Sequence, residues 1–213
     1  MKELSRKELL KKYDSVSYFS EGLAVAIKDN KQFHIYPNGM PAYKEKYNSV
    51  SFFSKGLAWA DKDGKQFHIR SNGTPAYKER FDSVNLFLEG LARVVKDGKE
   101  FHIRPDGTPA YKERYDSVSY FSVGLARVVK DGREFYIHPD GTLAHKEKYD
   151  SADYFSEGLA RVKKDGKEFH IYSDGTPAYK ERYDSIAFFS EGLAWVTKDG
   201  RGFYIHPDGT RAR

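Results

Sequence analysis

The sequence predicts an all-β fold, a six-bladed β-propeller built from six four-stranded repeats of 34 residues. Three observations support this prediction. One segment recurs at a fixed period, turn signals divide each copy into short pieces, and the pieces between the turns are rich in β-branched and aromatic residues. We therefore expect a single repeat domain over residues 1–213.

The repeat is marked most clearly by the tripeptide Gly-Leu-Ala, which recurs every 34 residues without an insertion from residue 22 to residue 194. Neighbouring copies such as 81–114 and 115–148 agree at most of their positions. Copies this similar indicate either recent duplication or human design. The expected copies are 13–46, 47–80, 81–114, 115–148, 149–182 and 183–213.

Turn signals divide each copy into short strands, as the fourth copy shows. Asp131-Gly132 is typical of a two-residue hairpin turn, because Asp and Gly tolerate positive φ. Pro139-Asp140-Gly141 marks a second tight turn and Gly124 a third. The pieces between the turns have the length of strands, not of helices. Four strands are expected, around 116–121, 125–130, 133–138 and 142–147.

The fourth strand is expected to lie outermost in its sheet. Proline recurs near its start and cannot donate a hydrogen bond to a neighbouring strand, so it belongs at an edge or at the first residue of a strand. Four-stranded sheets that bury both faces between neighbours and repeat around an axis form a propeller. The prolines are Pro41, Pro75, Pro109 and Pro177.

The two ends of the sequence favour closure into a ring. The sixth copy stops at Thr210-Arg211-Ala212-Arg213, before its fourth strand. Residues 7–12 lie 34 residues before 41–46 and so match the missing strand in register. We expect this N-terminal strand to complete the last blade. The alternative is an open β-solenoid capped by a helix, because residues 3–12 also have good helix propensity.

The composition excludes several classes of protein. The chain has no cysteine, which excludes disulfides, thiolate metal sites and a cysteine nucleophile. It has no apolar stretch long enough to span a membrane and no signal-peptide core, so we expect a soluble, cytoplasmic protein that does not bind a membrane. The net charge of +5 comes from the two ends, and the repeats 13–210 are neutral, which argues against nucleic-acid binding.

No motif predicts catalysis, a cofactor or a metal site. The sequence has no Gly-x-Ser-x-Gly elbow, no glycine-rich phosphate loop and no His-Glu-x-x-His motif. One repeat position reads His34, His68, His102, Tyr136, His170 and Tyr204, and the change to tyrosine favours a half-buried aromatic position over zinc ligation. We therefore expect no enzyme.

The motif Phe155-Ser156-Glu157-Gly158-Leu159-Ala160, followed by Lys164-Asp165-Gly166-Lys167 and Asp174-Gly175, resembles the WG (or KWG) repeat family of bacterial proteins. The resemblance covers 13–210. The family's Trp-Gly pair falls on Glu168-Phe169, so the naming motif is absent and the chain is a divergent relative. The resemblance implies a β-repeat scaffold and no catalytic residues.

The candidate binding residues occupy the one position of the second strand that changes in size and charge while its neighbours stay nearly fixed. Arginine and tryptophan there suit sugars or planar anions, through stacking and forked hydrogen bonds. We expect a monomeric, multivalent binding module for a protein or a carbohydrate. The alternative is a purely structural or designed repeat protein without a ligand. The position reads Val25, Trp59, Arg93, Arg127, Arg161 and Trp195.

Overall fold

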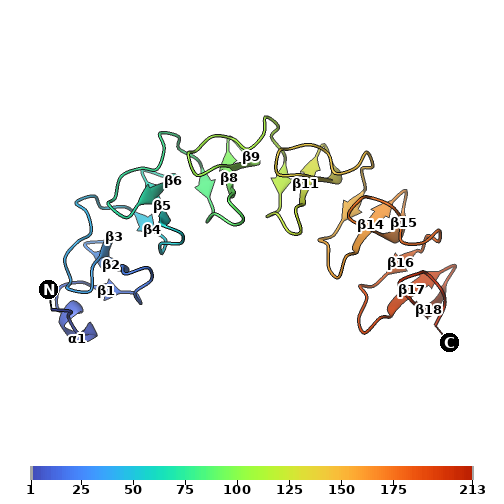
Figure 1. The fold of residues 1–213 in the computed structure, drawn as a ribbon, viewed down its shortest axis with the longest axis horizontal. Helices are drawn as coiled ribbons and strands as arrows, with labels where there is room; N and C mark the ends of the chain where they lie inside the picture. The colour runs from blue at the N-terminus through green and yellow to red at the C-terminus, as the bar shows by residue number, and fades with distance from the viewer. Residues whose placement is uncertain (1, 213) are drawn as a thin grey trace. The chain divides into compact units, whose positions relative to one another are not determined.

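The computed structural model describes residues 2–212. The chain divides into two compact units, Met1–Ala110 and Tyr111–Arg213, which are considered separately. Each unit contains three antiparallel sheets of three strands, one sheet for each repeat (Figure 1). The predicted all-β fold of six repeats is therefore confirmed.

The strands follow the repeat closely. In each sheet the second strand lies in the middle, with the first and third strands on either side of it. The first unit contains β1 (Ser15–Val16), β2 (Ala24–Lys28), β3 (Lys31–Ile35), β4 (Ser49–Val50), β5 (Leu57–Lys62), β6 (Lys65–Arg70), β7 (Ser83–Val84), β8 (Ala92–Lys96) and β9 (Lys99–Ile103). The second contains β10 (Ser117–Val118), β11 (Ala126–Lys130), β12 (Arg133–Ile137), β13 (Ser151–Ala152), β14 (Ala160–Lys164), β15 (Lys167–Ile171), β16 (Ser185–Ile186), β17 (Ala194–Lys198) and β18 (Arg201–Ile205).

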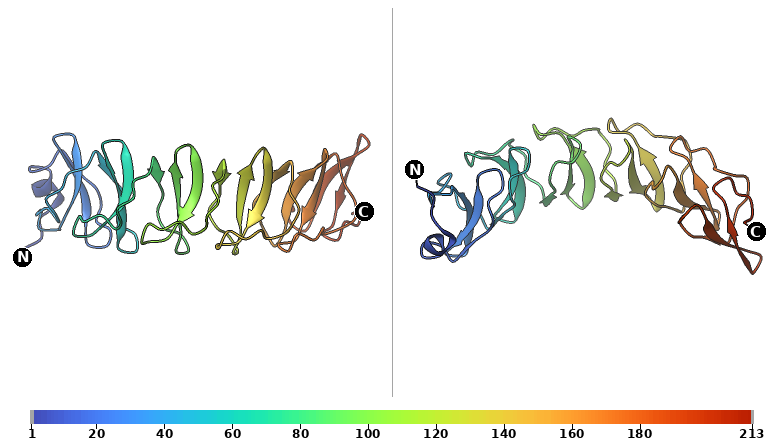
Figure 2. Two further views of the ribbon diagram at one scale, coloured as in Figure 1. Left: turned by 90° about the horizontal axis from the view of Figure 1, so that it is seen from above. Right: turned by 60° about the horizontal axis from the view of Figure 1, so that its bottom comes forward.

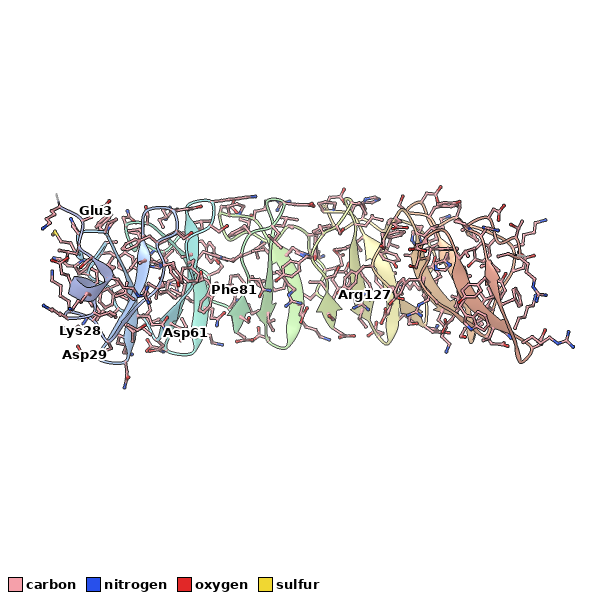
Figure 3. All side chains as sticks on the ribbon, turned by 90° about the horizontal axis from the view of Figure 1, so that it is seen from below. Glu3, Lys28, Asp29, Asp61, Phe81 and Arg127 are labelled. Atoms are coloured by element: carbon pink, nitrogen blue, oxygen red, sulfur yellow. The ribbon has the colours of Figure 1, made fainter. Side chains whose placement is uncertain are left out.

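The hairpin between the second and third strands forms where the Asp-Gly pair predicts it. In the third repeat Asp97 and Gly98 both have positive φ, 53° and 71°. Two such residues make the tight turn whose twist matches that of the flanking strands. Lys96 therefore pairs directly with Lys99. At this edge of the first unit Lys28 and Asp29 are visible at the end of their hairpin (Figure 3).

Within each unit the three sheets follow one another in sequence order (Figure 2). The middle sheet therefore has a neighbouring sheet on each of its faces. One face carries small and aromatic residues, such as Ala160 and Phe169, which are buried in the core of the second unit. The other face carries Arg161 and His170, which pair across the two strands. That face packs toward the following repeat, where the ring of His170 lies 4.8 Å from that of Phe189.

The predicted fourth segment lies at the outer edge of the third strand, as expected. The prediction that it forms a regular strand is wrong. In the first repeat only isolated bridges, Ile35 with Pro41 and Gln32 with Tyr47, join it to the outer edge of β3. A side chain contacts the irregular segment in the second repeat. Arg80 Nη1 donates to three successive carbonyl oxygens of residues 77–79 at 2.9–3.3 Å. Successive carbonyls of an extended strand point in opposite directions, so this segment curls instead of forming a strand.

The predicted N-terminal closing strand is also wrong, because the segment forms the helix α1 (Arg6–Leu9). Ser5 and Glu8 form a capping box, in which the Ser5 side chain accepts from the Glu8 backbone and the Glu8 side chain accepts from the Ser5 backbone. The helix packs on the first repeat, where buried Leu9 lies against Gly39. The predicted register holds, since Tyr43 lies against Gly73 one repeat later.

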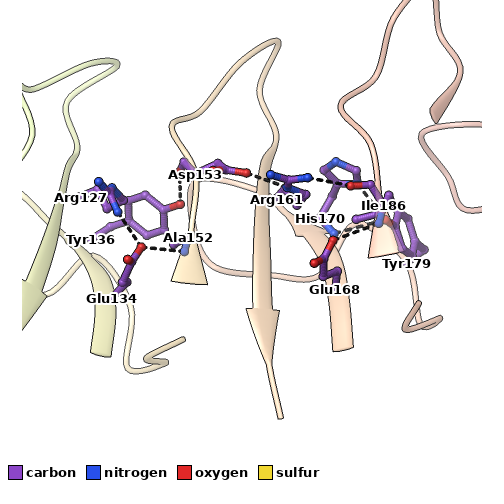
Figure 4. A network of polar contacts seen from close by, with 10 residues as sticks. All are labelled: Arg127, Glu134, Tyr136, Ala152, Asp153, Arg161, Glu168, His170, Tyr179 and Ile186. Carbon is purple, nitrogen blue, oxygen red and sulfur yellow. Dashed lines mark hydrogen bonds and ion pairs between the residues drawn. The ribbon is translucent and has the colours of Figure 1, made fainter. Parts of the chain in front are cut away.

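Neighbouring repeats are joined by a polar side chain of the third strand. Glu168 Oε2 accepts the backbone N–H of Ile186 at 3.0 Å, and Glu134 Oε2 accepts that of Ala152 at 2.8 Å (Figure 4). Glutamine serves in the first unit, where Gln32 Oε1 accepts the N–H of Val50 at 3.0 Å. In each case a backbone N–H of the first strand of the following sheet gains a hydrogen-bond acceptor.

Candidate functional site

The predicted binding residues lie in the middle of the central strands, on the face that packs toward the following repeat. Each pairs across the sheet with the histidine or tyrosine of the His34 position, as Trp59 does with His68. Four of the five are partly buried, whereas Trp195 is 43% exposed. Within each unit the residues therefore lie on separate sheets, at equivalent positions.

Arg127 lies against an aromatic ring of the next repeat. Its guanidinium carbon is 5.5 Å from the centre of the Tyr154 ring, and its Nη1 donates to Glu134 Oε2 at 2.7 Å. Glu134 is the same side chain that accepts the Ala152 N–H (Figure 4). Arg127 is thus held by an ion pair and a ring at the junction of two repeats.

Arg161 repeats this arrangement one copy later with different partners. Its guanidinium carbon lies 4.8 Å from the centre of the Phe188 ring. Its Nε donates to Asp153 Oδ2 at 2.7 Å and its Nη1 to the Ile186 carbonyl at 3.0 Å (Figure 4). The other predicted residues have different neighbours. Arg93 Nη1 lies 3.8 Å from Glu100 Oε2, and the ring centres of Trp195 and Tyr204 are 4.9 Å apart.

Sequence reasoning missed a set of exposed rings beside these arginines. We call this set the aromatic row. Tyr154 is 58% and Phe188 51% exposed, although each lies under an arginine of the preceding repeat. The signal was present in the sequence, because this position is aromatic or apolar in every repeat and directly precedes a phenylalanine that all six repeats share. The aromatic row consists of Tyr120, Tyr154 and Phe188 in the second unit, and the same repeat position holds Tyr18, Phe52 and Leu86 in the first unit.

Sequence reasoning also missed a buried histidine–tyrosine pair. The His34 position was expected to be half-buried, but His34 and His68 are each only 1% exposed. In the second repeat the Tyr77 hydroxyl accepts the His68 backbone N–H at 3.2 Å and lies 2.6 Å from His68 Nδ1. The hydroxyl therefore donates to Nδ1, and the ring proton stands on Nε2, which donates to the Asn85 carbonyl at 3.0 Å. Burial lowers the pKa of His68 to about 4.

Two equivalent hollows lie beside the interrupted fourth segments of the first and fifth repeats, with volumes of about 460 and 530 Å³. The larger one is lined by Tyr149, Phe169 and Arg182, among others. Arg182 there stacks on Phe169 at 3.6 Å, and Lys164 forms an ion pair with Glu147. The charges in this hollow are thus largely balanced.

Two further observations concern residues 2–212 as a whole. No three His, Asp or Glu side chains in this range gather in a geometry that would hold a metal ion. No helix in the same range has the length and apolar character needed to span a membrane.

Comparison with known proteins gives a clear match to one family. The model described as WG containing repeat matches the chain six times and covers most of its length. No curated protein matches the chain. The matched residues are 5–31, 38–65, 69–99, 103–133, 135–167 and 174–201.

Solved structures resemble the chain in fold alone. A crystal structure of a eukaryotic initiation factor has a TM-score of 0.51 at 10% identity, with 93% of this chain and 64% of that chain covered. Hsv2p of Kluyveromyces lactis has a TM-score of 0.43 at 9% identity, with 91% and 74% covered. YCF48 bound to a D1 peptide has a TM-score of 0.41 at 13% identity, with 86% and 74% covered.

Proposed function

Because the chain belongs to the family of proteins with WG-containing repeats, we propose that it is a non-catalytic scaffold that binds an extended neutral carbohydrate at its aromatic row. The observation that carries this proposal is the repeated stacking of an arginine on an exposed ring of the next repeat. It occurs at Arg127 with Tyr154 and again at Arg161 with Phe188. The same chemistry is thus presented more than once within the second unit.

The exposed rings favour a ligand with an apolar face. Exposed apolar patches on a folded protein commonly mark an interaction surface. Tyr154 and Phe188 each leave about half of their surface open, whereas Phe155 and Phe189, which follow them, are partly buried against the core. A sugar ring presents C–H groups on its flat faces, and these can cover an aromatic ring.

The charge balance favours a neutral ligand over an anion. Arg127 is paired with Glu134 and Arg161 with Asp153, so neither guanidinium offers an uncompensated positive charge. The same groups supply both donors and acceptors close to the rings. Hydroxyl groups of a carbohydrate can use both kinds, because a hydroxyl donates one hydrogen bond and accepts two.

Repetition supplies affinity that a single ring lacks. Each ring–sugar contact is weak, but a chain that occupies two or more equivalent places binds the later ones at a high effective concentration. The expected behaviour is therefore weak binding of a monosaccharide and affinity that grows with chain length.

A protein partner is the second candidate, and it is favoured by a separate observation. Val123 is 71% exposed and Leu88 49% exposed, at positions where other repeats carry polar residues. Exposed aliphatic side chains of this kind suit a protein surface better than a sugar.

The test is calorimetric titration of the full chain with neutral oligosaccharides of increasing length. Tyr154→Ala and Phe188→Ala should each weaken binding about three- to tenfold, through loss of one stacking contact. Tyr172→Ala is the matched control, because Tyr172 is 45% exposed but lies outside the aromatic row. The oligosaccharide should be recovered unchanged, as expected of a protein that is not an enzyme.

Equal loss of binding in the Tyr172 control would contradict the assignment to the aromatic row. No binding of any oligosaccharide would overturn the carbohydrate proposal. The two remaining candidates would then be a protein-binding role and a purely structural role. Val123→Lys distinguishes them, because it should weaken the binding of a protein partner and have no effect on a protein without one.

A further inference from the structure

A small pocket lies at the junction of the fifth and sixth repeats, next to the aromatic row. Its volume is about 110 Å³, the space of roughly four water molecules at about 30 Å³ each. Exposed Phe188 is one of its walls, so the pocket is reached from the same surface as the row. The lining residues are Ser156, Glu157, Leu159, His170, Phe188, Phe189, Gly192 and Pro207.

One polar residue that lines this pocket is the buried His170. The residue is only 2% exposed, and its Nε2 has no hydrogen-bond partner among residues 2–212. A buried nitrogen without a hydrogen-bond partner destabilises the folded protein, so its presence indicates that a ligand atom binds there. Figure 4 shows His170 beside Tyr179 and Arg161.

The hydrogen-bond pattern defines what His170 offers. The Tyr179 hydroxyl accepts the His170 backbone N–H at 3.2 Å and lies 2.8 Å from His170 Nδ1. We assign His170 the tautomer of His68, in which the tyrosine hydroxyl donates to Nδ1 and Nε2 carries the ring proton, because Nε2 of His68 faces a carbonyl oxygen that can only accept. Burial also lowers the pKa of His170 to about 4, so the ring is neutral near neutral pH. The pocket thus presents one uncharged N–H donor.

In the first and second repeats a backbone carbonyl within the chain accepts from this nitrogen. His34 Nε2 lies 2.9 Å from the Ser51 carbonyl and His68 Nε2 lies 3.0 Å from the Asn85 carbonyl. The equivalent residue for His170 is Ala187, whose carbonyl does not reach it. The partner that Nε2 lacks is therefore an amide-type carbonyl oxygen, the group that its counterparts bind.

The walls set the remaining properties of the ligand. Leu159, Phe189 and Pro207 are apolar and suit a methyl group, whereas the Glu157 carboxylate disfavours an anion. We propose that the pocket binds the acetamido group of an N-acetylated amino sugar, with its carbonyl oxygen on His170 Nε2 and its methyl group against the apolar walls. An acetamido group has four heavy atoms, which agrees with the size of the pocket.

This inference rests on the proposed function, because the sugar ring that carries the acetamido group would lie on Phe188. It adds specificity that the aromatic row lacks, since exposed rings accept many neutral sugars. One acetylated residue at this junction would fix the position of the carbohydrate chain along the row.

The test compares two neutral ligands that differ in the acetamido group, a β-1,4-linked trimer of N-acetylglucosamine and the matching trimer of glucose. We expect the acetylated trimer to bind about tenfold more tightly, the gain from one added hydrogen bond and a buried methyl group. In the unmodified protein, the ¹⁵N resonance of His170 Nε2 should move with the acetylated trimer and stay in place with the glucose trimer.

Variants separate the two proposals. His170→Phe should abolish the preference for the acetylated trimer, whereas His68→Phe, the matched control in the first unit, should leave it intact. Equal binding of both trimers with an unmoved His170 resonance would overturn the pocket assignment and leave the aromatic row in place. Failure of both trimers to bind would overturn the proposed function as well. The resonance measurement stays decisive if His170→Phe does not fold.

Discussion

Tyr136 and His145 occupy exchanged positions, because the equivalent residues of the second repeat are His68 and Tyr77. In four other repeats, as in His68 and Tyr77, the histidine comes first and the tyrosine nine residues later. The exchange keeps the contact to the following repeat, because the Tyr136 hydroxyl donates to the Asp153 carbonyl as His68 Nε2 does to its own partner. The ring centres of the exchanged pair are 5.7 Å apart, close to the 5.8 Å of the usual order.

The exchange predicts a compensated double variant in the second repeat. His68→Tyr alone crowds two tyrosines together, and Tyr77→His alone leaves His68 Nδ1 without its donor, so each should lower the free energy of unfolding by about 1–3 kcal/mol. His68→Tyr with Tyr77→His should recover part of this loss, because it restores the contact to the following repeat but leaves the exchanged histidine without a hydrogen-bond partner, as His145 is. Urea unfolding of the four proteins gives the coupling energy, and strictly additive effects would contradict the pairing.

The buried histidines predict a loss of stability in mild acid. Burial lowers the pKa of His34, His68 and His170 to about 4, against 6.5 for an exposed histidine. Between these values the unfolded chain binds more protons than the folded one, so stability is complete above about pH 6.5 and falls as the pH drops toward 4. By pH 5 each histidine should cost about 2 kcal/mol.

Carboxylates act in a separate pH range. Hydrogen bonds lower the pKa of Asp106 and Asp174 below the usual 3.8, so their contribution is lost only in stronger acid. Chemical unfolding at pH 7.5, 6 and 5 therefore isolates the histidines. A free energy of unfolding that stays constant over this range would show that they are not buried in the neutral form.

The repeat and its hairpins could be predicted from the sequence because they depend on local chemistry. Asp131 and Gly132 adopt positive φ, as the Asp-Gly pair predicted. The prediction of a fourth strand failed because this segment is bent in the first five repeats, whether its last residue is arginine, as Arg80, or lysine, as Lys46. Residue preferences alone did not indicate that bend.

The N-terminal segment shows a different limit. Its register with the repeats was predicted, and Leu9 does take the place of the Tyr43 side chain one repeat earlier. The pattern of Ser5 followed by Glu8 was visible and is typical of a helix start. The closing strand was expected from the register, against the helix propensity of residues 3–12, and the capping signal adds to that propensity. In the candidate site, the central-strand positions were predicted, but the exposure of Tyr154 and Phe188 required the packing of whole repeats.

The helix α1 predicts a contrast between two adjacent leucines. Leu9 is 2% exposed and lies against Gly39, whereas Leu10 is 46% exposed. Leu9→Ala should release the helix and lower the stability of the first unit by about 2–5 kcal/mol. Leu10→Ala should change it by less than about 0.5 kcal/mol. Hydrogen exchange of residues 4–13 reports the release directly. Equal protection in the two variants would show that Leu9 does not hold the helix on the first repeat.

The side-chain contacts between repeats predict that an acceptor, and not a charge, is needed at Glu168. Its carboxylate accepts the N–H of Ile186, and Gln32 performs the same task for Val50 with an amide oxygen. Glu168→Gln should therefore stay within about 0.5 kcal/mol of the original stability. Glu168→Ala leaves a backbone N–H of the sixth repeat without its partner and should cost about 1–3 kcal/mol. Thermal unfolding of both variants makes the comparison, with exchange of the Ile186 amide as the local readout. A loss in Glu168→Gln as large as that in Glu168→Ala would show that the negative charge holds the two repeats together.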